Sequence, residues 1–145
     1  MGHPVLVKME IYVNEVNAFR ITNTDHNYNG LGDRIPPFFV FQNKQFGFRF
    51  RVNGNNNYDI QYDYELNKQY QIEISQEKNS DGEAVYKIII NGETFHEVIN
   101  TTPSNFDNVL VYLSDVHYDT FGPFGSLANL RISSVLSKLI LINSV

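Results

Sequence analysis

Apolar and polar residues alternate with a period of two along most of this chain. Between Val5 and Val13 every odd position is apolar, and the same pattern returns in residues 46–52, 58–65 and 70–75. Successive side chains of a β-strand point to opposite faces of its sheet. Each alternating segment can therefore cover a core with one face while its other face meets water. The pattern predicts an all-β fold built from packed sheets.

Asn-Gly and Asp-Gly pairs separate the alternating segments. Asn53-Gly54 and Asn91-Gly92 stand between strand-like runs, and Asp81-Gly82 opens another. These pairs tolerate the positive φ angles of type I′ turns, so each predicts a β-hairpin. About ten short strands at this spacing are typical of an antiparallel β-sandwich or a barrel. We expect them near residues 4–13, 17–23, 37–42, 45–52, 57–64, 68–76, 84–91, 93–99, 108–114 and 126–133.

The length of 145 residues suits a single domain. Residues 1–133 are predicted to form the β-sandwich, and residues 134–145 a C-terminal extension or an edge strand. The 11 Lys and Arg residues are scattered and the net charge is -5, so no nucleic-acid partner is expected. No apolar run approaches the roughly 18–20 residues that cross a bilayer, so no membrane span is expected. The chain contains no cysteine, which excludes disulfides and thiolate metal sites.

Two long segments, residues 23–37 and 114–125, interrupt the hairpin pattern, and long loops in compact domains often carry function. The first holds four oxygen donors in a Gly-containing loop: Asp25, Asn27, Asn29 and Asp33. Calcium prefers several oxygen ligands from carboxylates, amides and carbonyls, so these residues are candidate metal ligands. The alternative is that they form turns, in which Asp and Asn side chains bond their own backbone.

The second long segment holds a candidate ligand-binding surface. A sugar is recognised by planar hydrogen-bonding groups beside an aromatic face. Residues of both kinds stand together in this segment: Asp115, His117, Tyr118, Asp119 and Phe121. They are predicted to bind a glycan or a protein partner. The alternative is an aromatic lid over one end of the sandwich.

One predicted strand carries a row of acidic residues like that of a jelly-roll glycoside hydrolase. Asp59, Asp63 and Glu65 share one parity, and the last two would lie about 6–7 Å apart. Ile60 and Tyr62 have the other parity and are expected to face the core, which leaves the acids in solvent, where nothing prepares a general acid. The chain also lacks an HExxH motif and a Gly-x-Ser-x-Gly elbow. A non-catalytic protein is therefore expected.

Short pieces occur in a particular order along the chain: Gly32–Pro36, Val52–Asn55, Asn91-Gly92, Asn100-Thr101, Val111–Asp115 and Gly125–Leu130. Together they resemble a laminin-G-like, concanavalin-like jelly-roll module of multidomain extracellular invertebrate proteins. The resemblance covers roughly residues 9–132. The chain departs from the module's pattern at Tyr70, where Trp is usual, and the first strands of a full module are expected to be missing before Val5.

The resemblance implies an extracellular sandwich that binds a glycan or an extracellular protein, with calcium at a loop rim and no established catalytic residues. The leading hypothesis is a non-catalytic recognition or adhesion module with calcium as its candidate cofactor. Two alternatives stay open. One is a glycoside hydrolase or lyase of jelly-roll fold, and the other is a structural domain docked in a larger assembly through Val135–Ile142.

Overall fold

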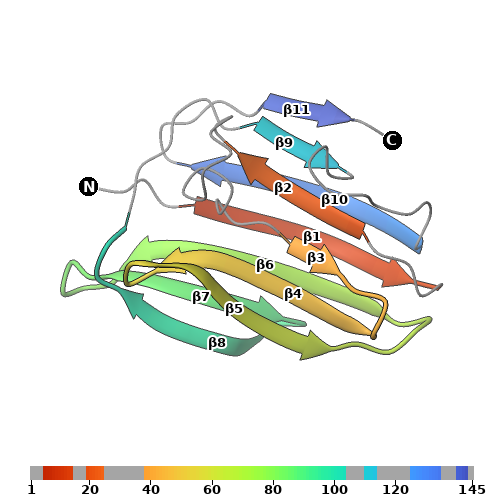
Figure 1. Ribbon diagram of the computed structural model, residues 1–145, viewed down its shortest axis with the longest axis horizontal. Helices are drawn as coiled ribbons and strands as arrows, with labels where there is room; N and C mark the ends of the chain where they lie inside the picture. The colour runs from red at the N-terminus through yellow and green to blue at the C-terminus, as the bar shows by residue number, and fades with distance from the viewer. Residues whose placement is uncertain are drawn as a thin grey trace.

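The computed structural model describes residues 5–14, 19–24, 38–103, 110–113, 125–134 and 140–143. These residues form eleven β-strands, and no helix occurs among them. The strands build two sheets that pack face to face as a sandwich (Figure 1). The all-β fold class predicted from the alternation is confirmed. Nothing in this part of the chain is a helix long and apolar enough to span a membrane.

The five-stranded sheet has the order β10-β1-β6-β7-β8 and is antiparallel throughout. Its strands are β10 (Gly125–Ser134), β1 (Val5–Val13), β6 (Gln69–Lys78), β7 (Ala84–Ile90) and β8 (Glu93–Asn100). Strand β1 therefore pairs on one side with β6 and on the other with β10, which follows more than a hundred residues later.

The six-stranded sheet has the order β11-β9-β2-β3-β4-β5. Its strands are β11 (Ile140–Asn143), β9 (Leu110–Leu113), β2 (Phe19–Thr24), β3 (Phe38–Val40), β4 (Gln45–Val52) and β5 (Asn55–Asp63). Strand β11 runs parallel to β9 at one edge, and the other neighbouring strands are antiparallel.

The alternation in the sequence sets which face of each strand is buried. On β6, Tyr70, Ile72 and Ile74 are buried, whereas Gln71 is exposed and Glu73 is half-buried. The separation into a core face and a water face, predicted from the alternation in residues 70–75, is therefore confirmed. The same alternation buries the inward residues of β7, which pairs with β6, and of β4 in the opposite sheet: Phe46, Phe48, Phe50, Ile88 and Ile90.

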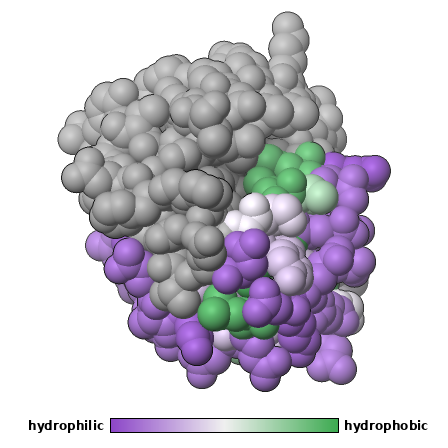
Figure 2. All heavy atoms as spheres, turned by 90° about the vertical axis from the view of Figure 1, so that its right-hand side faces the viewer, coloured by the Kyte–Doolittle hydropathy of each residue, from purple (hydrophilic) through white to green (hydrophobic). Residues whose placement is uncertain are grey.

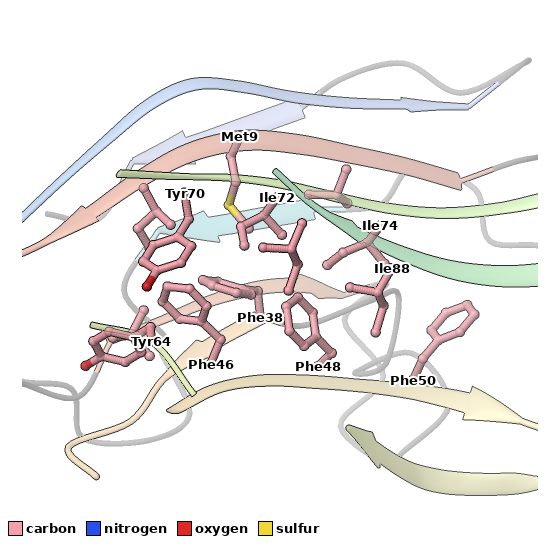
Figure 3. Packing of buried hydrophobic residues seen from close by; sticks show 14 of the residues in the cluster. Met9, Phe38, Phe46, Phe48, Phe50, Tyr64, Tyr70, Ile72, Ile74 and Ile88 are labelled. Carbon is pink, nitrogen blue, oxygen red and sulfur yellow. The ribbon is translucent and has the colours of Figure 1, made fainter. Parts of the chain in front are cut away.

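Aromatic rings of the six-stranded sheet meet aliphatic side chains of the five-stranded sheet in the core (Figure 3). Phe46 is fully buried at its centre, stacked on Tyr64 with ring centroids 4.5 Å apart. Its ring also meets Tyr70 of the opposite sheet edge-on, at 5.3 Å. Each such side chain contributes about 1.5–3 kcal/mol through its removal from water, so this interface is the main source of stability.

Two of the three predicted hairpin turns have the expected backbone. Both residues of Asn53-Gly54 and of Asn91-Gly92 have positive φ, as a type I′ turn requires. At Asp81-Gly82 only the glycine has positive φ, at 78°. There the side-chain oxygen of Asn79 accepts the backbone N–H of Asp81 at 3.0 Å, so an Asx turn replaces the type I′ geometry.

A buried asparagine at the end of β8 ties the two sheets together. Asn100 is 2% exposed, and its amide donates to Gln76 Oε1 of β6 at 2.7 Å and to the carbonyl of Arg51 of β4 at 3.2 Å. Its oxygen accepts the backbone N–H groups of Asn53 and Thr102, each at 3.1 Å. Every hydrogen-bonding direction of this side chain is therefore used within the fold.

Aromatic contacts close the side of the sandwich where the edge strands β5 and β8 lie (Figure 1). Tyr58 of β5 hydrogen-bonds His96 Nε2 of β8 at 2.6 Å, and Tyr62 meets Phe95 edge-on at 5.0 Å. Phe95 occupies a register shift of β8, where an extra residue interrupts the pairing with β7. A bulge of this kind re-aims side chains, and here two successive residues of β8 reach the opposite sheet.

Candidate functional site

The site residues predicted from the sequence lie outside the described residues. This holds for the candidate calcium ligands Asp25, Asn27, Asn29 and Asp33, and for the candidate ligand-binding residues Asp115, His117, Tyr118, Asp119 and Phe121. Both sets stay predictions. Among the residues that the structure does describe, no three His, Asp or Glu side chains lie close enough to hold a metal ion.

The acidic row of β5 lies on the outer face of the six-stranded sheet. Asp59 pairs with Arg49 at 3.3 Å, and Asp63 accepts a hydrogen bond from Gln45 at 2.9 Å. Ile60 packs against the core on the opposite face. The prediction that Ile60 faces the core and the acidic residues face solvent is therefore confirmed. Both carboxylates form contacts with side chains on the sheet surface.

A groove of about 550 Å³ crosses the outer face of the five-stranded sheet. Its walls and floor come from β10, β1, β6, β7 and the β7–β8 turn. Alternation explains its polar lining, because the residues that flank the buried Met9 and Ile72 point outward. The lining residues are Lys8, Met9, Glu10, Gln71, Ile72, Glu73, Ile89, Gly92, Asn129 and Arg131.

Strand register arranges the charged residues of the groove in rows across the sheet. Lys8 of β1 lies opposite Arg131 of β10 on one side and opposite Glu73 of β6 on the other. In the next row Glu10 lies opposite Gln71. The groove therefore offers two cations, two carboxylates and amide groups within a few strand widths.

A β-bulge in β10 adds one more polar side chain to the groove. The pairing of β1 with β10 shifts between Lys8 and Glu10, and Asn129 in the shifted segment has a φ of 53°. Asparagine tolerates this left-handed conformation better than most residues. Its side-chain amide donates to Glu10 Oε2 at 2.6 Å, which holds that carboxylate in one orientation. Bulges that re-aim side chains are frequent beside functional sites.

A second hollow of about 300 Å³ adjoins the groove along β1 and shares Glu10 with it. Tyr12 lines this hollow, between Gln69 of β6 and Ser126 of β10. The Tyr12 hydroxyl donates to Asn67 Oδ1 at 3.2 Å, which restrains the ring. The two hollows together place an aromatic side chain beside a field of hydrogen-bonding groups.

Sequence reasoning placed the polar residues of β1 and β6 on a solvent face but did not mark them as a site. Their role depends on β1 lying between β10 and β6, which alternation within each strand does not reveal. The bulge at Asn129 gives no signal in the sequence beyond an asparagine within a strand.

No protein-family model matches the chain, and no curated protein matches it.

Proposed function

We propose that this chain is a carbohydrate-binding module and that a glycan lies in the groove on the outer face of the five-stranded sheet. The observation that carries the proposal is the groove itself, which joins charged and amide side chains from β10, β1 and β6. The adjoining hollow adds the ring of Tyr12. Resemblance to an extracellular recognition module supports the same class of function.

The chemistry of the groove favours a polyhydroxylated ligand. Each sugar hydroxyl both donates and accepts a hydrogen bond, and the groove supplies donors in Lys8 and Gln71 and acceptors in Glu10 and Glu73. Tyr12 can cover the apolar face of a sugar ring. These groups stand on paired strands, which hold a binding site more accurately than loops do.

The described surface gives a protein partner less to bind. The end of the molecule shown in Figure 2 is mostly hydrophilic where it is described, with small hydrophobic patches separated by polar atoms. Among described residues the exposed large hydrophobic side chains are Phe95 and Ile99, both on β8, and neither lines the groove. Protein interfaces usually centre on aromatic or aliphatic anchors, which favours a glycan over a protein for the groove.

A glycan array probed with the purified chain, once with calcium and once with EDTA, tests this proposal. We expect a defined set of glycans to be retained. Replacing Gln71 by Ala should weaken binding about five- to tenfold, because one or two ligand hydrogen bonds are lost. The matched control is Gln61→Ala, on the exposed outer face of β5. Retention of no glycan, or an equal loss in the control, would contradict the proposal.

A glycoside hydrolase is the second candidate, because the groove contains two carboxylates. Glu10 and Glu73 are diagonal neighbours on adjacent strands, since Glu10 pairs with Gln71. Diagonal neighbours lie about 7–8 Å apart, within the range of about 5–9.5 Å between the carboxyls of glycosidases. New reducing ends from a retained polysaccharide, abolished by Glu10→Gln or Glu73→Gln, would favour this candidate. Retention without cleavage favours the non-catalytic module.

A further inference from the structure

We infer that the ligand of the groove is an acidic glycan, whose carboxylate or sulfate group is bound between Lys8 and Arg131. This inference rests on the proposed function and names the class of sugar. Its starting point is the register of β1 and β10, which sets Lys8 directly opposite Arg131 on the outer face of the sheet.

Like charges in this position repel each other. Directly opposed residues on antiparallel strands have Cβ atoms about 4.5–5.5 Å apart, and like charges there destabilise the pair. Neither Lys8 nor Arg131 forms an ion pair with a described carboxylate. An anion held between the two would relieve the repulsion. The pair is therefore more stable with a bound anion than without one.

The two carboxylates of the groove balance its formal charge, but neither forms an ion pair with Lys8 or Arg131. Glu10 is engaged by the amide of Asn129 at 2.6 Å. Glu73 lies opposite Lys8 on the β6 side, so strand β1 separates it from Arg131. Strand β10 is the last strand of its sheet in the described part of the chain, so no described strand supplies an acid beyond Arg131. The positive charge therefore lies toward the β10 side of the groove, and the negative charge of Glu73 toward the β6 side.

The cation pair suits a single acid group on a sugar, which it would bind by direct contact, and not a polyanion attracted from a distance. The guanidinium of Arg131 can bind two oxygens of a carboxylate or sulfate at once, and Lys8 adds a point charge. The whole chain has a net charge of -5, so it repels polyanions at a distance. Charges beyond about 8 Å are screened at physiological salt, which leaves the local pair to select the ligand.

The test compares neutral and acidic polysaccharides, including one series in which the backbone stays the same and only the acid group changes. Dextran, carboxymethyl-dextran and dextran sulfate are titrated into the chain, together with polygalacturonate and chitin oligosaccharides. We expect the acidic probes to bind and the neutral probes to bind at least about tenfold more weakly. The carboxymethyl and sulfate forms distinguish the two acid groups, and added salt should weaken both.

Charge variants identify the residues. Lys8→Gln and Arg131→Gln should each weaken the binding of acidic probes about tenfold and the binding of neutral probes clearly less, whereas Arg131→Lys should weaken acidic probes less than Arg131→Gln does. The matched control is Lys78→Gln, which removes the same charge from an exposed position at the end of β6.

The failure of this inference differs from the failure of the proposed function. Equal binding of neutral and acidic probes, or an equal loss in the Lys78 control, would overturn the acidic ligand and leave a glycan-binding groove. Binding of none of the probes in the panel or on the array would overturn both.

Discussion

Asn100 stands in an N-glycosylation sequon, but its burial in the fold is incompatible with glycosylation. Asn100-Thr101-Thr102 is the only N-glycosylation sequon of the chain. Glycosylation needs a free amide nitrogen, yet this one is buried and donates to Gln76 and to Arg51. A chain glycosylated at Asn100 could not place this residue in the fold.

We therefore predict that the folded protein carries no glycan at Asn100. When the chain is secreted from eukaryotic cells, the mass of the folded fraction should equal that of the bare polypeptide. Any glycosylated fraction should be misfolded and retained in the cell. A soluble, folded protein with a glycan at this position would contradict the burial described above.

Removal of the same amide should cost stability. Asn100→Ala leaves Gln76 Oε1 and the backbone N–H of Asn53 without their partner, and each unsatisfied buried group costs about 1–3 kcal/mol. We expect the free energy of unfolding in urea to fall by about 2–4 kcal/mol. The control Asn43→Ala, in an exposed turn, should change it by less than about 0.5 kcal/mol. Equal effects of the two variants would show that the network contributes nothing.

At the scale of a strand, the start of β10 is held against the end of β1 by a glycine. Gly125 has a φ of 154°, and a Cβ atom there would lie 1.8 Å from the carbonyl oxygen of Tyr12. Strand β10 can pair with β1 at this point only because the side chain is absent. The position of Tyr12 beside the groove depends on the same contact.

Two glycine variants separate steric overlap from backbone strain. Gly82→Ala has open space around its Cβ and a φ of 78°, so it should cost about 1–2 kcal/mol through conformation alone. Gly125→Ala adds a backbone clash and should cost clearly more in urea unfolding. It should also weaken glycan binding, because the shift moves Tyr12. A smaller cost at Gly125 than at Gly82 would contradict this account of the β1–β10 junction.

For the molecule as a whole, the junction of the two sheets at β5 and β8 predicts a pH dependence. Burial lowers the pKa of His96 from the ordinary value of 6.5, so the native state keeps the imidazole neutral where the unfolded chain has bound a proton. Above about pH 6.5, His96 does not change the free energy of unfolding. Below that pH the free energy of unfolding falls, until the pH reaches the lowered pKa of the native state, beyond which His96 causes no further loss.

Urea unfolding of the wild type and of His96→Gln at about pH 7.5 and pH 5 checks this prediction. The wild type should lose more stability at the lower pH, because the variant has no imidazole at position 96 that unfolding could protonate. Identical losses would show that His96 is not protected from protonation. A matched ring titration by NMR should place the native pKa below 6.5.

The sequence predicted the parts of this fold that depend on neighbours along the chain. Alternation assigned Ile72 and Ile74 to the core and Gln71 to the surface, and Asn91-Gly92 marked its turn. Pairing between distant segments was not predictable in the same way. The groove arises where Lys8 meets Arg131 across β1 and β10, and period-two alternation is equally consistent with other strand orders.

The position of β1 also determines when the groove can form. Hairpins β4–β5, β6–β7 and β7–β8 link neighbouring segments and can form as soon as they are synthesised. Strand β1 must wait for β6 and then for β10, and such long-range pairing is intrinsically slow. Arg131 and Asn129 enter the groove only with that last pairing. An incomplete chain therefore has no binding surface, and ligand capture can serve as a direct assay of completed folding.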